Sequence, residues 1–86
     1  MKEYVSVDVE TTGLAPKQDK IIEIGAVRVR DGQIVESFTS FVNPGRILPA
    51  HITELTGILQ EQVDKAAPME SVLPAFLEFA GDLPLC

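Results

Sequence analysis

Residues 4–14 read YVSVDVETTGL, and this stretch decides the fold. Valines at every second position from Val5 to Val9 alternate with other residues, which predicts a β-strand over Tyr4–Glu10. Asp8 and Glu10 are two residues apart, so their side chains point to the same face. Neighbouring carboxylates repel each other, and hard cations such as Mg²⁺ and Mn²⁺ bind carboxylate oxygens. The strand is therefore a candidate metal site, whereas simple solvation of both carboxylates is the plainer interpretation of an isolated Asp-x-Glu.

A loop and two further strands are expected after this stretch. The loop covers Thr11–Lys20, where glycine, proline and polar residues interrupt the alternation. The second strand covers Lys20–Arg30 and the third covers Gln33–Val42. Between them, Asp31-Gly32 predicts a tight hairpin, because both central positions of a type I′ turn need positive φ. Ile22, Ile24, Ala26 and Arg28 are expected to share one face of the second strand. In the third strand, the predicted core residues are Ile34, Phe38 and Phe41.

Helical patterns dominate the second half of the chain. Pro49–Gly57 suits a short helix that ends at a glycine, and residues 58–67 suit a second helical turn and a loop. An amphipathic helix follows from Met69 to Ala80. Pro74 is tolerated only near a first turn, so this helix is expected to begin close to Ser71 or to be kinked. Its predicted apolar face comprises Met69, Val72, Leu73, Phe76, Leu77 and Ala80.

The last four residues, Leu83–Cys86, read as the start of another strand. A helix followed by a new strand indicates a crossover connection in a mixed sheet. The predicted fold class is therefore α/β, a mixed sheet with flanking helices.

The motif Asp8-Val9-Glu10-Thr11-Thr12-Gly13-Leu14 after an apolar strand resembles the first motif of the DEDD 3′→5′ exonucleases. The likeness is greatest to the ε-subunit-like and polymerase-associated proofreading exonucleases of bacteria, which have an RNase H-like fold. Further segments resemble the family in order: Lys20–Val27 its second strand, Phe41–Pro44 the end of its third, Ile52–Ile58 the segment over the 3′-terminal nucleotide, and Val72–Gly81 the helix before its second motif.

This resemblance implies an RNase H-like fold in which residues 1–86 form the N-terminal part of a single exonuclease domain. It implies hydrolysis at a nucleic-acid 3′ end with two divalent cations, Mg²⁺ or Mn²⁺. Asp8 would bridge both cations and Glu10 would bind one. The substrate-binding residues implied are Thr11, Thr12, Gly13 and Leu14 against the terminal nucleotide, and Leu55 and Thr56 against its base. Core packing is an equal alternative for Leu55.

The sequence also departs from the family pattern. The second and third motifs, which supply two further aspartates and a histidine or tyrosine, are not in these 86 residues. Asp82 precedes the predicted last strand and is interpreted as a loop residue. His51 is interpreted as a surface or capping residue, and Cys86 as an incidental thiol. This chain alone is therefore expected to be inactive.

Composition narrows the classes of protein to which this chain can belong. A net charge of −6 argues mildly against a nucleic-acid binder, although bound cations would reverse the local sign. A single cysteine, no apolar stretch of about 20 residues and no signal peptide predict a cytoplasmic protein without a membrane partner. Two carboxylates are too few for a calcium-binding module.

The expected partner is a nucleic-acid 3′ end, DNA more than RNA, in proofreading or repair. A polymerase or a helicase is a candidate protein partner, and self-association is expected of so small an α/β unit. The alternative function is a non-catalytic half-domain that acts as a binding or assembly module.

Overall fold

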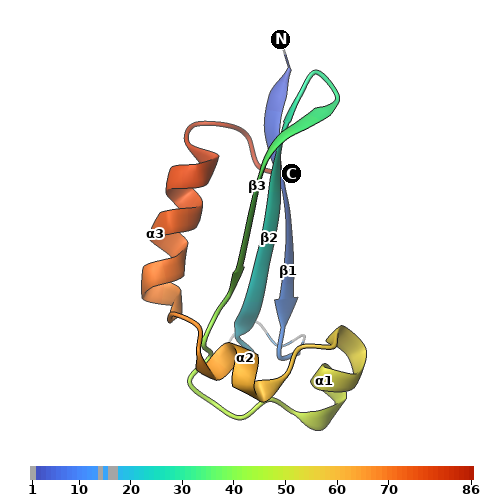
Figure 1. The fold of residues 1–86 in the computed structure, drawn as a ribbon, viewed down its shortest axis with the longest axis vertical. Helices are drawn as coiled ribbons and strands as arrows, with labels where there is room; N and C mark the ends of the chain where they lie inside the picture. Colours follow the sequence, from blue (N-terminus) through green and yellow to red (C-terminus); the bar gives the residue numbers. More distant parts are fainter. Residues whose placement is uncertain (1, 14, 16–17) are drawn as a thin grey trace.

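The computed structural model describes residues 2–13, 15 and 18–86, which form an elongated body of 43 × 24 × 23 Å (Figure 1). Three strands, β1 (Glu3–Thr11), β2 (Ile21–Arg30) and β3 (Gln33–Phe41), form an antiparallel sheet in the order β1-β2-β3. Three helices follow, α1 (Ala50–Thr56), α2 (Gln60–Asp64) and α3 (Met69–Ala80). The three strands predicted before residue 43 and the three predicted helices are present, within one or two residues of their expected bounds.

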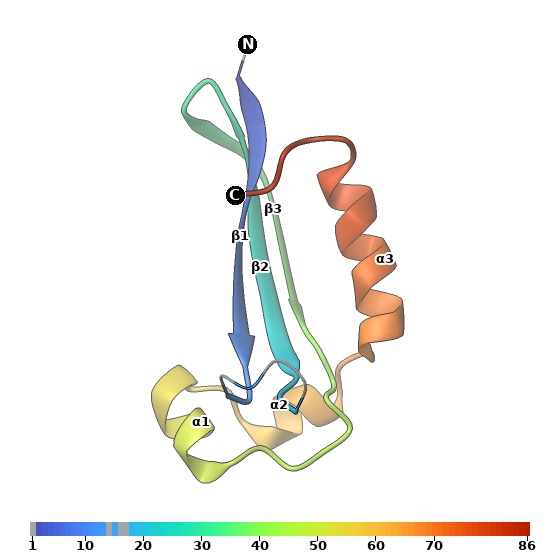
Figure 2. The same cartoon turned by 180° about the vertical axis from the view of Figure 1, so that it is seen from behind.

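The last residues of the chain lie beside β1, on the edge that β2 leaves free (Figure 2). Leu85 forms a parallel bridge with Val5, and the Val7 amide donates to the Cys86 carbonyl at 3.0 Å. The Cys86 amide in turn donates to the Val5 carbonyl at 2.8 Å. This contact is an isolated parallel bridge and not a full strand, so the sheet has three antiparallel strands. The crossover that brings residues 84–86 beside β1 is present, whereas the predicted fourth strand is represented only by this bridge.

The hairpin between β2 and β3 has the predicted geometry. Asp31 and Gly32 have φ values of 50° and 83°. Both are positive, as a type I′ turn requires. Asp31 also accepts a hydrogen bond from the Lys2 amide at 2.9 Å, which ties the turn to the beginning of β1.

The helix α3 covers one face of the sheet and leaves the other face open (Figures 1 and 2). Phe76 lies edge-on to Phe38 of β3, with ring centroids 5.9 Å apart. Phe79 packs against the same ring at 5.6 Å. The buried core on this face comprises Val5, Ile24, Ala26, Val42, Val72, Phe76 and Ala80.

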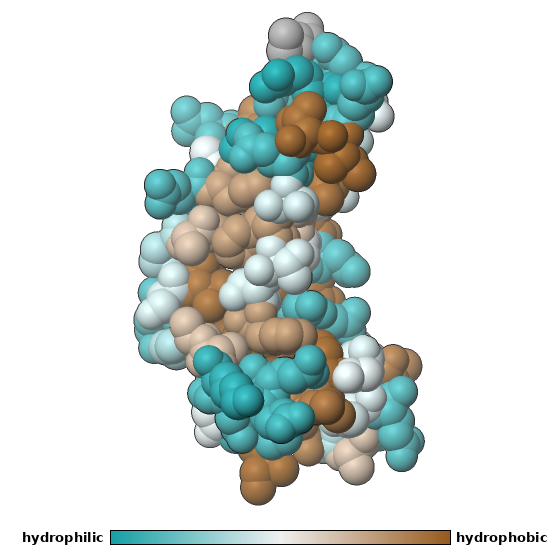
Figure 3. All heavy atoms as spheres, in the orientation of Figure 1, coloured by the Kyte–Doolittle hydropathy of each residue, from teal (hydrophilic) through white to brown (hydrophobic). Residues whose placement is uncertain are grey.

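Three of the predicted core residues are exposed. Leu73 and Leu77 are 41% and 53% exposed, because α3 turns Phe79 rather than these leucines toward the sheet. Ile34 is 67% exposed; it follows the Asp31-Gly32 turn by two residues, at the end of the hairpin that extends past α3 (Figure 1). Figure 3 shows hydrophobic atoms at the surface near this hairpin. The other two predicted residues of β3, Phe38 and Phe41, do pack against the core.

Helix α3 begins two residues earlier than expected. Pro68 occupies its N-cap and the helix starts at Met69, so the predicted start near Ser71 is wrong. Pro74 lies inside the helix, where it has no amide hydrogen to donate to the Glu70 carbonyl. Burial of the apolar face compensates for that missing bond.

Arg28 joins the end of α3 to the sheet. Its guanidinium lies 5.3 Å from the Phe79 ring centroid and donates to the Phe79 carbonyl. It also pairs with Glu36 at 2.6 Å. A cation near the C-terminal carbonyls of a helix is favourable, so Arg28 acts there as a C-terminal cap. Its predicted place on the core face of β2 is confirmed.

A second buried cluster holds α1 and α2 against the end of the sheet where β1 finishes. Gly57 ends α1 with a φ of 79°, a conformation that favours glycine, and its amide donates to the Thr53 carbonyl. The cluster comprises Ile22, Leu48, Ile52, Ile58 and Val63, with Phe41 beside them. This packing places α1 next to the last residues of β1. In the part of the chain that the structure describes, no helix is long and apolar enough to cross a membrane.

Candidate functional site

Asp8 and Glu10 lie on the open face of the sheet. Odd-numbered residues of β1 such as Val5 and Val7 face α3, so the even-numbered residues face away from it. Asp8 is opposite Gly25 on β2, and Glu10 is opposite Glu23. Asp8 is exposed and Glu10 is half-buried. The predicted juxtaposition of the two carboxylates on one strand face is therefore present.

The pairing of β1 with β2 shifts between Glu10 and Thr11. Such a bulge bends a strand and redirects the side chains next to it. The chain beyond the bulge turns toward α1, and the two enclose a hollow of about 420 Å³. Its lining comprises Val9, Glu10, Thr11 and Gly13 from the end of β1, and His51, Ile52, Leu55 and Thr56 from α1. Glu10 thus borders both the open sheet face and this hollow.

Helix α1 contributes an exposed leucine and a hydrogen-bonded threonine to the hollow. Leu55 is 79% exposed, so it does not pack in the core of these residues, and its alternative interpretation as a core residue is wrong for this structure. The Thr56 hydroxyl donates to the Ile52 carbonyl at 2.8 Å and accepts from the Ile58 amide at 3.1 Å. The hollow therefore combines an apolar wall from α1 with the carboxylate of Glu10.

The remaining predicted substrate-binding residues differ in their placement. Thr11 and Gly13 line the hollow, and the Thr11 hydroxyl donates to the Gly13 carbonyl at 2.6 Å. Thr12 does not line it: its side chain is only 3% exposed. Leu14 lies outside the described residues. The Thr12 side chain is therefore turned away from the hollow, and the expectation that residues 11–14 lie against a terminal nucleotide stays a prediction.

Sequence reasoning missed three residues that line the hollow. His51 is an exposed residue of α1, as predicted, but it also borders the hollow, together with Val9 and Ile52. The only sequence feature that could have indicated them is their closeness to predicted site residues: Val9 adjoins Glu10, and His51 and Ile52 precede Leu55 by four and three residues. Asp82 follows α3 and Cys86 is exposed beside β1, so neither reaches the hollow, as expected.

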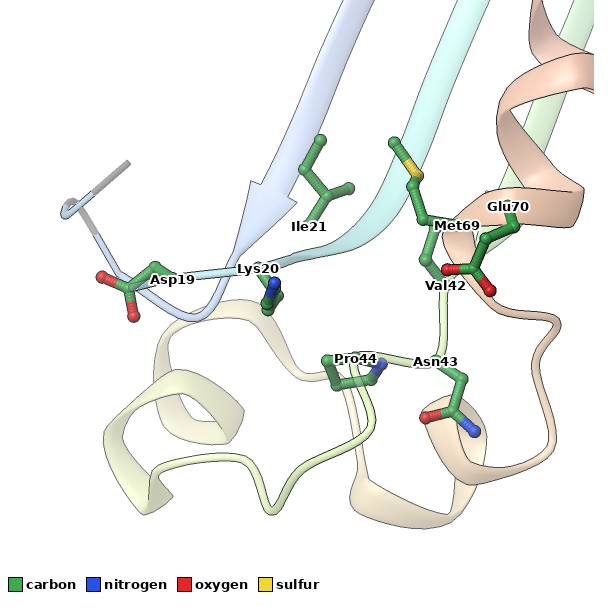
Figure 4. Close-up of a pocket in the computed structure, with 8 residues that line it drawn as sticks. All are labelled: Asp19, Lys20, Ile21, Val42, Asn43, Pro44, Met69 and Glu70. Carbon is green, nitrogen blue, oxygen red and sulfur yellow. The ribbon is translucent and has the colours of Figure 1, made fainter. Parts of the chain in front are cut away.

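Two further hollows are lined by residues within the described ranges. One of about 350 Å³ is lined by residues before β2, after β3 and at the start of α3 (Figure 4). It contains neither Asp8 nor Glu10. The other, of about 280 Å³, is an open depression on the exposed sheet face, where Asp8 lies among Ser6, Gly25, Ser37 and Thr39. The small side chains around Asp8 leave its carboxylate accessible.

The donor set at Asp8 and Glu10 fits a divalent cation only in part. Both carboxylates are accessible, and neither takes part in an ion pair within residues 2–13, 15 and 18–86. Carboxylate oxygens are the ligands that Mg²⁺ and Mn²⁺ prefer. Over the same described ranges, however, no three His, Cys, Asp or Glu side chains converge as a metal site. Asp8 and Glu10 thus supply two accessible carboxylates, and no third ligand joins them among the residues that the structure describes.

Residues 5–84 match the family described as exonuclease, RNase_T. The chain is 54% identical over 80 residues to the DNA polymerase III PolC-type of Clostridium perfringens, covering 93% of this chain and 6% of that protein. It is 47% identical over 79 residues to the PolC-type polymerase of Bacillus subtilis, covering 92% of this chain and 6% of that protein. The chain therefore spans about 6% of the length of these curated relatives.

Solved structures with similar folds are also nucleases. The nuclease domain of 3′hExo, described as a DEDDh family member bound to rAMP, superposes with a TM-score of 0.78 and 29% identity. Exonuclease X in complex with 5′ overhanging duplex DNA gives a TM-score of 0.74 and 32% identity. The two likenesses cover 90% and 85% of this chain, and 42% of each of those chains.

Proposed function

This chain belongs to the RNase_T exonuclease family and shares part of its RNase H-like fold, and we propose that it forms the N-terminal part of a domain that removes nucleotides from the 3′ end of DNA. The observation that carries this proposal is that Glu10 shares a strand face with Asp8 and also lines the hollow beside α1. A terminal nucleotide in that hollow would have its phosphate beside both carboxylates.

Each residue of the site has a defined task in this proposal. Asp8 and Glu10 would be the residues of this chain that hold the divalent cations. When bound, these cations supply an activated water and stabilise the leaving oxygen. Leu55 presents apolar surface to the terminal base, and Thr11 and Gly13 form the opposite wall. Orientation by these residues reduces the entropy lost on reaching the transition state.

The relatives support DNA over RNA as the substrate. The curated matches with 44–54% identity are DNA polymerases, and one solved neighbour is a DNA complex. At 29% identity, other solved neighbours include an exonuclease that recognises a histone mRNA stem-loop. We therefore propose a proofreading role next to a polymerase active site. A helicase partner and a cytoplasmic location stay predictions.

The first test of this proposal is Mn²⁺ binding by the 86-residue chain. Titration should broaden the NMR signals of residues 8–13 first, because paramagnetic Mn²⁺ affects the nuclei nearest to its ligands. The dissociation constant should be weak, roughly millimolar, because two carboxylates fall short of a full ligand set.

Two matched variants decide where the metal binds. Asp8→Asn should remove the broadening of residues 8–13, whereas Asp64→Asn in α2 should leave it unchanged. Broadening that begins instead around Glu61 and Asp64 would place the metal elsewhere and contradict the proposed site.

A second prediction concerns the isolated chain, which we expect to self-associate and to lack nuclease activity. The exposed leucines of α3 and the unpaired outer edge of β3, with Ile34 and Val35, are available for contact with another copy. Two carboxylates are too few for two-metal hydrolysis. Analytical ultracentrifugation should show dimers or larger species, and 3′-labelled single strands with Mn²⁺ should stay intact. A monomer that trims such strands would contradict both expectations.

The alternative function, a binding or assembly module without catalysis, rests on the same incomplete ligand set. It predicts that Mn²⁺ has no effect on residues 8–13, which the titration above measures directly.

A further inference from the structure

The loop between β1 and β2 contains a buried polar residue that the proposed chemistry does not use. Among residues 2–13, 15 and 18–86, Thr12 is the one polar side chain that is buried. Its hydroxyl donates to Asp19 Oδ1 at 2.8 Å and accepts from the Lys20 amide at 2.9 Å. The Thr12 amide also donates to the Lys20 carbonyl at 2.9 Å. Thr12 therefore joins the two ends of the loop.

Asp19, which accepts the hydrogen bond from Thr12, is also bonded to Ala15 within the loop. Its second carboxylate oxygen, Oδ2, accepts from the Ala15 amide at 2.8 Å, and its own amide donates to the Ala15 carbonyl at 2.8 Å. The hydrogen bonds from Ala15 and Thr12 hold the pKa of the Asp19 carboxyl below its ordinary value, with smaller contributions from Arg46 and His51. The carboxylate is thus ionised at neutral pH, where its hydrogen bonds are charge-assisted.

Asp19 also lies directly behind Gly13. A Cβ atom added to Gly13 would lie 2.5 Å from Asp19 Oδ2 and 2.8 Å from Asp19 Cγ. The space behind Gly13 is therefore filled by the carboxylate, and only glycine fits between it and the rest of the turn. Gly13 itself lines the hollow under α1, together with Thr11. The Asp19 carboxylate thus supports one wall of that hollow from behind.

We propose that Asp19 is a positioning residue, which fixes the Thr11–Gly13 turn through Thr12 and thereby sets the affinity of the hollow for a nucleoside monophosphate. This proposal rests on the proposed function, because it needs the hollow to bind a nucleotide. Asp19 does not line that hollow; it borders the separate one near the start of α3, at the end far from Met69 and Glu70 (Figure 4). Its effect on the nucleotide is therefore indirect.

The test is Asp19→Asn in the 86-residue chain, with affinity for dAMP in the presence of Mg²⁺ measured by NMR shift changes. Asparagine has the same size, but it offers one acceptor oxygen where the turn uses two. The dissociation constant for dAMP should rise about tenfold, which corresponds to the loss of one hydrogen bond to a charged group. The melting temperature should fall only slightly. Asp64→Asn is the matched control and should change neither quantity.

Variants of Thr12 separate positioning from general stability. Thr12→Val preserves the volume but removes the hydroxyl, so it should weaken dAMP binding as much as Asp19→Asn does. Thr12→Ser retains the hydroxyl and should restore wild-type affinity. Because the proposal has Asp19 act on the turn through Thr12, the losses of dAMP affinity should not add, and the double variant Thr12→Val/Asp19→Asn should bind no more weakly than Thr12→Val. A merely structural role would instead give additive losses of melting temperature.

The possible outcomes distinguish this inference from the function on which it rests. If the wild-type chain does not bind dAMP, the proposed nucleotide site and the role of Asp19 both fail. If wild type binds and Asp19→Asn binds equally well, the positioning role is overturned while the nucleotide site stands. If Asp19→Asn does not fold, the Thr12→Val and Thr12→Ser pair decides: equal affinities overturn the proposal, and a tenfold difference supports it.

Discussion

Replacing Asp8 by alanine is expected to lower exonuclease activity by about a thousandfold or more. The experiment uses a chimera in which residues 5–84 replace the matching segment of the Clostridium perfringens polymerase, to which this chain is 54% identical. A catalytic metal supplies several kcal/mol of transition-state stabilisation, and each 1.36 kcal/mol corresponds to a tenfold change in rate. Release of nucleotides from a 3′-labelled strand measures the loss.

Asp82→Ala is the matched control, because this aspartate lies in the turn after α3, away from the hollow. It should leave the rate within about twofold. Asp8→Ala should not unfold the protein, since the Asp8 side chain is exposed and has a like-charged neighbour in Glu10. In metal-free buffer its melting temperature should equal or exceed that of wild type. Substantial hydrolysis by Asp8→Ala would refute the proposed role of this residue.

The sheet could be predicted because its signals are local. The alternation of β1 fixes which side chains share a face, and the Asp31-Gly32 pair fixes the hairpin between β2 and β3, although the register of these strands shifts once between Arg28 and Val29. Burial depends on what covers each strand, and this information is not local. Ile34 has the same pattern as Phe38, yet only Phe38 lies under α3.

The candidate site likewise has features that local sequence patterns predict and features that depend on tertiary packing. The position of Asp8 and Glu10 on one face follows from strand geometry alone. The contribution of Leu55 depends on how α1 packs, which the buried Ile52 and Ile58 determine. The role of Asp19 was not predictable, because its bonds to Thr12 and Ala15 arise from the folded shape of a loop. No periodic pattern in a sequence encodes such contacts.

Replacing Phe76 by alanine should destabilise the 86-residue chain by about 3–5 kcal/mol. Phe76 is only 6% exposed and belongs to the cluster that joins α3 to the sheet. Its ring centroid lies 5.9 Å from that of Phe38. Small domains have total stabilities of about 5–15 kcal/mol, toward the lower end for chains of this length. Most of the variant should therefore be unfolded at room temperature, as far-UV circular dichroism and urea titration can measure.

The neighbouring variant Leu77→Ala tests which face of α3 packs on the sheet. Leu77 is 53% exposed, so its truncation should change the free energy of unfolding by less than about 0.5 kcal/mol. The periodicity of the sequence places Phe76 and Leu77 on the same apolar face, whereas the structure buries only Phe76. Similar losses for the two variants at low protein concentration would mean that the helix is rotated toward its leucines. A loss for Leu77→Ala that appears only at high concentration would instead locate the self-association surface on α3, because truncating an exposed leucine matters only where another chain covers it.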